Sequence, residues 1–180
     1  MERGMCCMVI KCMGAILLIV GTTAFGVYQG CLYKSRLAHM DEIKRAFLYI
    51  QGEIRYMNTP MPETLEGTAH QMKGECRAFF SRVAEGLLCG KGREFKKVWE
   101  EAADEELPEE VLEREARELL REMGGQLGCL DRQTQERAID YFLEKWGSLI
   151  EKKQREKKDK LKLYYVCGVM SGLLMVIIIV

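Results

Sequence analysis

The chain has 180 residues with 27 basic and 27 acidic side chains, and this zero net charge excludes the global attraction that drives nucleic-acid binding. Hydrophobic residues make up 48 % and charged residues 30 %, a composition that excludes an intrinsically disordered chain. Only three prolines are present, which suits long helices better than a turn-rich β fold. Five of the eight cysteines lie in or beside apolar segments at the two ends and three stand singly, so they are expected to be reduced and mostly buried thiols. Because no CxxC motif occurs, a zinc ribbon or a thioredoxin-type site is not expected.

Residues 12–33, which follow a short N-terminal extension at 1–11, contain no Asp, Glu, Lys or Arg. About 20 helical residues cross the hydrocarbon core of a bilayer, so this segment is predicted to be a first transmembrane helix. A cleaved signal peptide is the alternative. Tyr28 and Gln29 do not match the residues that precede the cysteine in a lipoprotein cleavage box, so cleavage is not favoured.

Apolar residues recur at intervals of three and four through residues 34–150, and this period predicts a bundle of amphipathic helices without strands. The first helix is expected over residues 41–57, with an apolar stripe of Ile43, Phe47, Ile50, Ile54 and Met57. Thr59 is expected to cap the next helix, with Pro60 and Pro62 in its first turn, where amide hydrogens need no partner.

Further helix breaks are expected at Gly74, at Gly92, at Pro108 and in the glycine-rich stretch 124–128. Between these breaks, Trp99 lies on an apolar stripe at helical spacing. The composition and periodicity together predict an all-α fold, an antiparallel helical bundle between two transmembrane helices.

The last helix of the bundle is expected to start at Asp131, a good N-cap residue. No Gly or Pro interrupts residues 148–167, so this helix is expected to continue toward the C-terminus, with a break near Gln154 as the alternative. Residues 163–180 are again free of Asp, Glu, Lys and Arg and are predicted to form a second transmembrane helix. A buried core helix is less favoured, because the rest of the chain is too small to enclose it.

A basic juxtamembrane helix is expected at residues 151–162, just before the second predicted span. Its basic residues are Lys152, Lys153, Arg155, Lys157, Lys158, Lys160 and Lys162. The positive-inside rule therefore predicts that residues 34–162 lie in the cytoplasm. The same side chains are expected to attract anionic lipid headgroups.

Glycines at helical spacing occur in both predicted spans and allow two helices to approach closely in a membrane. They are Gly14, Gly21, Gly26, Gly30, Gly168 and Gly172. Glycine is common in membrane helices, so packing of the two spans against each other is left open.

Sequence motifs for catalysis are absent: there is no Walker-type loop, GxGxxG, HExxH or GxSxG. His70 has no second His or Cys at metal-ligand spacing and is expected at the surface, so we expect no enzyme activity, no metal site and no cofactor. The acidic run 100–122 alternates with arginines at spacings of three and four, as on a solvated helix face. A docking surface for a basic partner at Glu109, Glu110 and Glu113 is the alternative, and reversing these charges should then leave thermal stability unchanged.

Four stretches of the sequence carry a family resemblance. They are Lys11 to Ile19; Glu53 to Tyr56 followed by Thr59 to Leu65, which contains Pro60 and Pro62; Val98-Trp99 followed by Ala102; and Leu127 to Gln135, which contains Gly128 and Asp131. In these stretches, and in the order of span, helical domain and span, the chain resembles the stage III sporulation protein AB family of endospore-forming bacteria. The resemblance singles out Tyr56, Thr59, Pro60, Pro62, Trp99, Leu127, Gly128 and Asp131. We expect the aromatic and proline residues among them to pack the bundle, with an interface as the alternative.

The resemblance implies a non-enzymatic adaptor in the mother-cell membrane, with a soluble domain similar to the platform domain of type II secretion systems. The expected partners are a cytoplasmic secretion-type ATPase similar to stage III sporulation protein AA and other membrane subunits of the same complex. Platform proteins usually carry two bundles and three spans, whereas this chain has one bundle and two predicted spans, so homo-oligomerisation is left open. Two rival hypotheses are a membrane-anchored regulatory or receptor protein and a lipoprotein with an extracytoplasmic helical domain.

Overall fold

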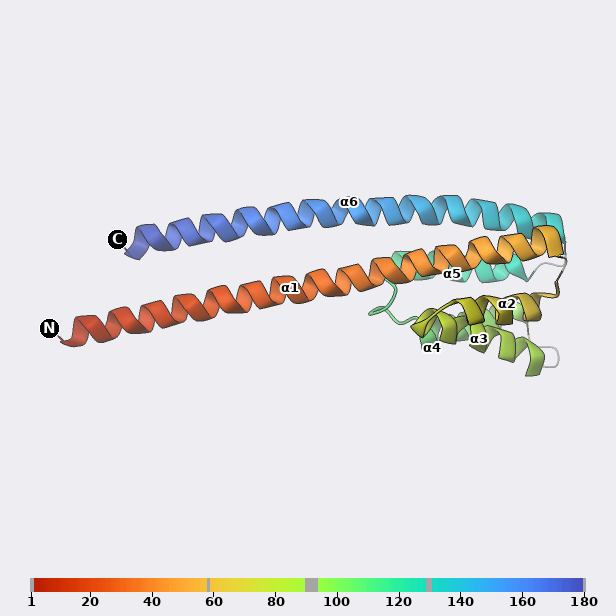
Figure 1. The fold of residues 1–180 in the computed structure, drawn as a ribbon, viewed down its shortest axis with the longest axis horizontal. Helices are drawn as coiled ribbons and strands as arrows, with labels where there is room; N and C mark the ends of the chain where they lie inside the picture. Colours follow the sequence, from red (N-terminus) through yellow and green to blue (C-terminus); the bar gives the residue numbers. More distant parts are fainter. Residues whose placement is uncertain (1, 58, 90–93, 129–130, 180) are drawn as a thin grey trace. The chain divides into compact units, whose positions relative to one another are not determined.

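The computed structural model describes the backbone of residues 2–57, 59–89, 94–128 and 131–179 (Figure 1). Side chains are described for residues 30–156 within these ranges and at positions 14, 21, 24 and 28. These residues form α-helices and one π-helical segment without any strand, which confirms the predicted all-α class. The elements are α1 (Glu2–Gly52), the π-helical segment (Glu53–Met57), α2 (Met61–Gln71), α3 (Gly74–Cys89), α4 (Phe95–Glu106), α5 (Arg114–Leu127) and α6 (Arg132–Ile179).

The chain divides into two units, one of residues 1–34 with 158–180 and one of residues 35–157. The first unit consists of the N-terminal part of α1 and the C-terminal part of α6. Among the described residues, no helix combines the length and the apolar character needed to cross a membrane. Most side chains of the predicted span 12–33 and all those of 163–180 lie outside the described residues.

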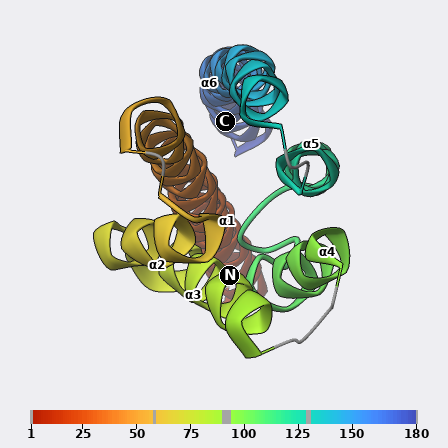
Figure 2. The same cartoon turned by 90° about the vertical axis from the view of Figure 1, so that its right-hand side faces the viewer.

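The second unit is a helical bundle in which α2, α3, α4 and α5 are neighbours in chain order (Figure 2). Its parts of α1 and α6 lie against each other: Trp146 Nε1 donates a hydrogen bond to the carbonyl of Met40 over 2.9 Å, and the ring centroids of Phe47 and Phe142 are 4.1 Å apart. Because the lower-numbered residue of α1 pairs with the higher-numbered residue of α6, these two segments are antiparallel, as predicted for neighbours in the bundle.

Six fully or almost fully buried aromatic side chains form the centre of the bundle. They are Phe47, Phe79, Phe80, Trp99, Phe142 and Trp146. Phe47 of α1 contacts α3, α4 and α6 at once, because its ring centroid lies 6.4 Å from Phe80, 6.2 Å from Trp99 and 4.1 Å from Phe142. Burying a side chain of this size stabilises the fold by about 2–3 kcal/mol.

Trp99 reaches the backbone of α5 because α5 has a glycine at the contact. The indole Nε1 of Trp99 donates to the carbonyl of Leu120 over 2.8 Å. Gly124, one helical turn further along, has no Cβ to block the ring: a Cβ there would lie 2.3 Å from Trp99 Cδ1. The family-motif residue Trp99 is therefore a packing residue, as expected, and it joins α4 to α5.

Several predicted boundaries are wrong. α1 extends to Gly52 and continues as the π-helical segment, so Met57 leaves the predicted stripe and is 69 % exposed, whereas Ile43, Phe47, Ile50 and Ile54 are buried as expected. α5 begins at Arg114, after a turn in which the amides of Val111 and Leu112 both donate to the carbonyl of Pro108.

The glycine-rich stretch does not break α5 where the pattern predicted. Gly124 and Gly125 lie inside α5, and only Gly128 stands at its C-cap. Tertiary packing explains the difference, because Gly124 is required by the indole of Trp99 and not by a turn. The break at Gly74 is confirmed, since its φ of 52° lies in the left-handed region and α3 starts there. Gly92 lies outside the described residues.

Asp131 caps α6 as predicted: its Oδ2 accepts the Thr134 amide over 2.9 Å and the Thr134 hydroxyl over 2.6 Å. These hydrogen bonds, led by that from the Thr134 side chain, hold the pKa of the Asp131 carboxyl below its ordinary value. α6 is continuous from Arg132 to Ile179, so the alternative break near Gln154 is not present.

Replacing Gly124 with Ala should destabilise the bundle, because the new methyl group collides with the indole of Trp99. We expect a loss of about 1–3 kcal/mol in the free energy of unfolding, measured by chemical denaturation of the purified chain. Gly125→Ala is the matched control: its nearest atom is Lys96 Cδ at 3.8 Å, so helix propensity alone should stabilise this variant by about 0.5–1 kcal/mol. Equal effects of the two substitutions would contradict the packing role of Gly124.

Candidate functional site

Two of the resembling motifs meet at one end of the bundle, where the π-helical segment lies beside the start of α6. Arg132 Nη2 donates a hydrogen bond to the carbonyl of Arg55. The guanidinium of Arg55 in turn lies 3.8 Å from a carboxylate oxygen of Glu136 and 3.8 Å from one of Asp140. The π-helical segment and the start of α6, far apart in sequence, are thus held at the same end.

The exposure of the motif residues at this end differs from the packing prediction. Tyr56 is 78 % exposed, so the expectation that it packs the bundle is wrong. Pro60 is exposed and Pro62 is half-buried. Leu127 is buried at the end of α5, whereas Gly128 and Asp131 are exposed. The end of the bundle therefore presents Tyr56 and its neighbour Met57 to the surroundings.

Thr59 does not cap α2, contrary to the prediction. Pro60 occupies the N-cap position, no side chain caps the helix, and the carbonyl of Pro60 accepts the amide of Thr64 over 3.0 Å. The hydroxyl of Thr59 donates instead to Glu53 Oε2 over 2.9 Å. Thr59 thus ties the π-helical segment to the turn before α2, and this contact shapes the exposed end of the bundle.

The acidic run is not a face of alternating charges along one helix, because its arginines pair mainly with other elements. Arg117 Nη2 lies 2.9 Å from Asp104 Oδ1 of α4, and Arg121 also pairs with Asp104. Arg114 with Glu118, at 2.8 Å, is the described pair of the i,i+4 type within α5. Asp104 therefore joins α4 to α5, while Glu105 and Glu106 pair with Arg82 of α3.

Glu113 connects the acidic run to α1 and α6. Its Oε1 lies 3.4 Å from Arg36 Nη1 of α1, and its Oε2 lies 2.6 Å from Lys153 Nζ of α6. Arg36 also donates to the carbonyls of Glu109 and Glu110 over 3.0 and 3.1 Å. Reversing the charge of Glu113 is therefore expected to lower stability, contrary to the expectation from the sequence, because this carboxylate joins three elements.

The titration of this contact follows from its surroundings. Burial by itself would raise the pKa of the Glu113 carboxyl, but the hydrogen bond and charge of Lys153, with Arg36, outweigh burial and lower it. Burial by itself would lower the pKa of the Lys153 ammonium, but the contacts with Glu113, Glu156 and Glu115 outweigh the effect of burial and raise this pKa. Both groups are thus held in their charged forms at neutral pH.

The basic stretch begins with side chains that face the protein. Lys152 Nζ lies 2.9 Å from Glu115 Oε1, and the Lys153 side chain is only 13 % exposed beside Glu113. Arg155 is exposed and pairs with Glu151 at 3.4 Å. The side chains of Lys157, Lys158, Lys160 and Lys162 lie outside the described residues. A role in headgroup binding stays a prediction, and Lys152 and Lys153 have carboxylate partners on α5.

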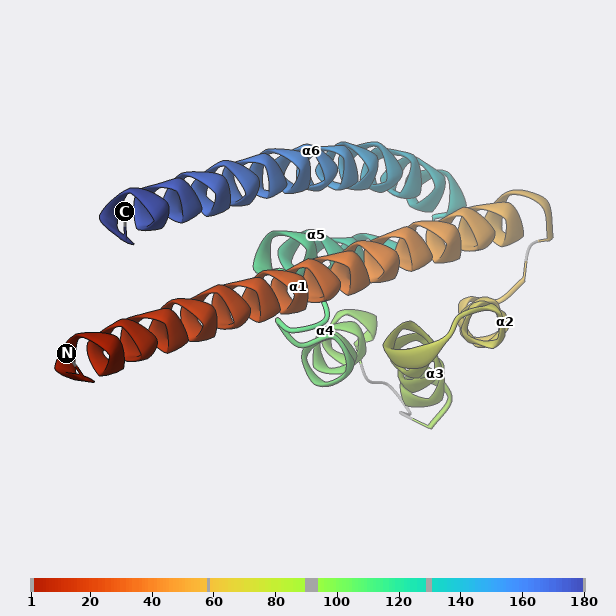
Figure 3. The same cartoon turned by 60° about the vertical axis from the view of Figure 1, so that its left-hand side comes forward.

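A groove of about 400 Å³ runs between α5 and α6, which lie side by side in Figure 3. Its acidic wall comes from α5, its other wall carries lysines of α6, and its floor is apolar. The lining residues are Glu115, Glu118, Leu119, Glu122, Lys145, Ser148, Leu149 and Lys152. A groove with an apolar floor and charged walls has the form that accepts an amphipathic helix of a partner.

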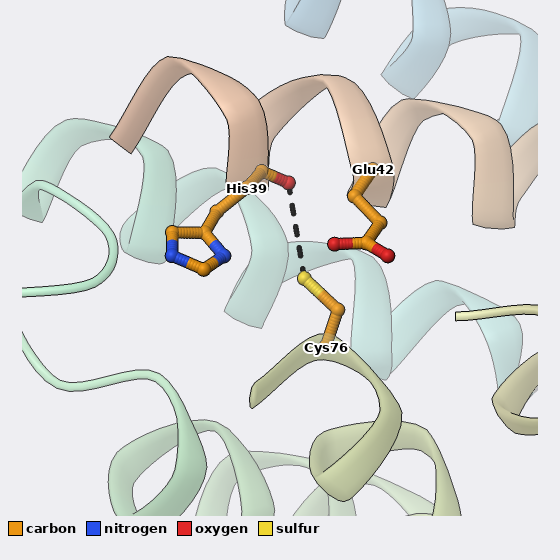
Figure 4. Close-up of side chains that lie close together, drawn as sticks. All are labelled: His39, Glu42 and Cys76. Atoms are coloured by element: carbon orange, nitrogen blue, oxygen red, sulfur yellow. Dashed lines mark hydrogen bonds between the residues drawn. The ribbon is translucent and has the colours of Figure 1, made fainter. Parts of the chain in front are cut away.

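A cluster of His39, Glu42 and Cys76 lies between α1 and α3 (Figure 4). The nitrogen, oxygen and sulfur atoms that these side chains offer lie within 4.8 Å of one another. Sequence reasoning missed the cluster, because Cys76 is far from His39 in the chain and the prediction considered only His70, which is exposed on α2 as expected. The spacing of His39 and Glu42, three residues apart on one helix, was the available signal.

Cys76 is fully buried, and its thiol donates a weak hydrogen bond to the carbonyl of His39 over 3.8 Å. Burial, followed by the charges of Glu42 and Glu75, raises the pKa of the Cys76 thiol to about 12. The other described free cysteines, Cys31 and Cys89, are exposed, so the expectation of mostly buried thiols is wrong for both.

The glycines expected to pack the two spans are only partly described. A Cβ at Gly14, Gly21 or Gly30 would meet no atom within 4 Å among the described residues. The surroundings of Gly26, Gly168 and Gly172 lie outside the described part of the chain. Packing of the spans through these glycines stays a prediction.

The fold and these surfaces define a class of helical-bundle protein. Its described surface carries a charged groove between α5 and α6 and an end at which Tyr56 and Met57 are exposed. The family model for stage III sporulation protein AB matches residues 11–180, and the chain belongs to this family. The family resemblance predicted from the sequence is thereby confirmed, and with it a role in sporulation; the family is not a known enzyme family.

Two relatives agree with this assignment. The chain is 25 % identical over 171 residues to stage III sporulation protein AB of Bacillus subtilis (strain 168), covering 94 % of this chain and 99 % of the relative. A solved structure of stage III sporulation protein AB superposes with a TM-score of 0.63 at 22 % identity, covering 69 % of this chain and 98 % of that chain. The superposition shows that the two share a fold.

Glu113→Gln should destabilise the bundle by about 1–2 kcal/mol at neutral pH, since it removes the charge that Arg36 and Lys153 contact in a half-buried position. The lowered pKa of Glu113 makes its contribution fully present above the ordinary value of 4.5 and lost as the pH falls through the folded-state pKa. The difference between wild type and variant, measured by denaturation at several pH values, should therefore shrink toward strongly acidic pH.

Glu110→Gln is the control for this substitution, because Arg36 contacts only the carbonyl of Glu110, which the substitution leaves in place. This variant should retain the wild-type free energy of unfolding within about 0.5 kcal/mol at every pH. A difference for Glu113→Gln that does not depend on pH would contradict the electrostatic origin of its contribution.

Cys76 should react slowly with iodoacetamide in the folded chain. A chelator is added so that no metal ion bound by the His39, Glu42 and Cys76 side chains protects the thiol. At pH 8 a thiol with a pKa of about 12 has a thiolate fraction about a thousandfold below that of a thiol with the ordinary value of 9.0, and burial slows it further. Peptide mass spectrometry over time should find Cys89 modified well before Cys76, and denaturation should equalise the two. Equal rates in the folded chain would show that Cys76 is not buried.

Proposed function

We propose that this chain is a non-enzymatic membrane platform or adaptor of a secretion-like trans-envelope complex required for endospore formation. In this role it links a cytoplasmic ATPase to the membrane subunits of the complex. The observation that carries the proposal is the extent of the family match, which spans residues 11–180 and therefore includes both uncharged segments as well as the bundle. A protein that only used the bundle fold for another purpose would not need to preserve this whole arrangement.

The membrane part of the proposal rests on the sequence. Residues 12–33 and 163–180 lack Asp, Glu, Lys and Arg, and each is close to the length that a helix needs to cross a bilayer. The excess of basic residues in 151–162 favours a cytoplasmic position for the bundle. The proposed location is accordingly the mother-cell membrane, with the bundle on its cytoplasmic side.

Contacts within the described bundle reduce the number of acidic side chains that are available to bind a partner. The carboxylates of Glu113 and Asp104 are already engaged by Lys153, Arg36, Arg117 and Arg121, so they are poor candidates for docking. Glu122, in contrast, lies exposed on the wall of the groove between α5 and α6. Glu118 on the same wall pairs with Arg114 of its own helix, but both side chains are exposed, so a partner can replace this pair at little cost.

The groove fits a helix with an apolar stripe and basic flanks. Leu119 and Leu149 supply the apolar floor of the groove. Its acidic wall consists of three glutamates that follow one another at intervals of about one turn along α5: Glu115, Glu118 and Glu122. We place the proposed contact with the ATPase, a protein similar to stage III sporulation protein AA, in this groove. In this proposal the apolar segments 12–33 and 163–180 contact the other membrane subunits.

A photo-crosslinking amino acid at Glu118 tests this placement in sporulating cells. We expect a covalent adduct with the ATPase, because position 118 lines the groove and is exposed. The same amino acid at Glu66, exposed on α2, is the control and should give no such adduct. Adducts at neither position would overturn the proposed docking site and favour a regulatory or receptor protein unrelated to secretion.

The variant Glu118→Lys adds a quantitative readout. It should reduce copurification of the ATPase at least about tenfold, which corresponds to about 1.4 kcal/mol. The melting temperature should stay within a few degrees of wild type, because the pair of Glu118 with Arg114 is exposed and such pairs contribute about 0–1 kcal/mol. Unchanged copurification together with a Glu118 adduct would mean that the groove touches the ATPase without contributing to affinity.

A further inference from the structure

The cluster between α1 and α3 combines three kinds of metal ligand that come from two helices. His39 and Glu42 lie three residues apart on α1, so their side chains are on the same face of that helix. Cys76 lies in the first turn of α3 and points toward them (Figure 4). One imidazole nitrogen, one carboxylate oxygen and one sulfur thus converge within 4.8 Å of one another.

The distances are close to those of a formed site. Around a tetrahedral zinc ion with bonds of about 2.0–2.3 Å, neighbouring ligand atoms stand about 3.3–3.8 Å apart. Since the three atoms lie within 4.8 Å of one another, an approach of about 1 Å brings them to these separations. Glu75 stands next to the cluster, with its Oε2 3.9 Å from His39 Nδ1, and either this carboxylate or a water molecule would complete the four ligands of zinc.

The surroundings of the ligands resemble the outer shell of a metal site. His39 Nε2 lies 3.3 Å from the hydroxyl of Ser35, an arrangement that leaves Nδ1 on the side of Glu75. Glu42 Oε1 accepts the backbone amide of Lys73 over 2.8 Å, which fixes the carboxylate in place. A carboxylate accepts such a hydrogen bond and binds a metal at the same time.

The charge of the cluster favours a divalent cation. Glu42 belongs to the cluster, and Glu75 Oε2 lies 3.9 Å from His39 Nδ1, so two carboxylates face the position of the metal. The mixed set of sulfur, nitrogen and oxygen selects zinc over magnesium or calcium, which prefer oxygen ligands alone.

We propose that His39, Glu42 and Cys76, with Glu75 beside them, form a zinc-binding site that fastens α3 to α1. Binding replaces the S–H bond of Cys76 with an S–Zn bond, and the released proton goes to solvent; no oxidation or reduction takes place. The consequence is structural, because a metal bond between the two helices holds α3 and the adjoining α2–α3 turn at Gly74 in place. This site does not depend on the function proposed above.

Metal titration of the full-length, detergent-solubilised and chelator-stripped chain tests the proposal, with Co²⁺ as the spectroscopic probe and Zn²⁺ as the competitor. We expect one Co²⁺ per chain, a thiolate-to-metal charge-transfer band, and loss of the band on addition of Zn²⁺. At a hundredfold excess over its Kd, Zn²⁺ should raise the melting temperature by about 5–10 °C.

Substitutions in the cluster should weaken binding while matched substitutions elsewhere should not. Cys76→Ser, His39→Gln and Glu42→Gln should each weaken Zn²⁺ at least about a hundredfold, and Cys76→Ser should abolish the charge-transfer band. The controls are Cys89→Ser and His70→Gln, an exposed cysteine and an exposed histidine, and both should bind as wild type.

Three results would overturn the site. The first is the absence of a charge-transfer band in the wild-type chain, and the second is a band that persists in Cys76→Ser, which would place the metal on another cysteine. The third concerns Glu42→Gln. Glu42→Gln guards against a folding artefact, since Glu42 is only half-buried and circular dichroism of the stripped variant should match wild type. If that folded variant binds Zn²⁺ with unchanged affinity, Glu42 is not a ligand and the three-residue site is wrong.

Discussion

The contact of Phe47 with three other helices is the interaction on which the bundle depends. Its ring lies against Phe80 of α3, Trp99 of α4 and Phe142 of α6, so one side chain of α1 sets the position of most other elements. Close packing of aromatic rings tolerates little displacement, because each ring fills space that its neighbours define. This core fixes the positions of the helices that form the groove, α5 and α6, and of those that carry the cluster, α1 and α3.

Trp99 extends the same core to α5 through a hydrogen bond as well as by packing. The donation from Nε1 to the carbonyl of Leu120 satisfies a polar group that would otherwise be costly to bury. It is possible only because Gly124 leaves the backbone of α5 accessible. The position of α5 then decides where the acidic run lies, and hence which of its carboxylates face lysines of α6.

The ion pairs between the acidic run and the basic stretch reduce the charge that either segment offers to an outside partner. In the sequence they are a negatively and a positively charged segment, each able to attract an outside partner. In the bundle, Glu113 and Glu115 are neighbours of Lys153 and Lys152, so part of each charge is satisfied within the protein. The groove beside these pairs keeps Glu118 and Glu122 exposed, which makes it the more specific candidate surface.

By itself the sequence determined the all-α class, the buried stripe of α1, the cap at Asp131 and the family, because hydrophobic period, capping chemistry and motif order are local properties. Only the tertiary structure decided that Gly124 lies inside a helix, that Tyr56 is exposed and that Thr59 contacts Glu53 and does not cap α2. It also decided that His39 and Cys76 meet across two helices. Each of these depends on which side chain of another element occupies the space beside it, and a pattern along one segment carries no information about that neighbour.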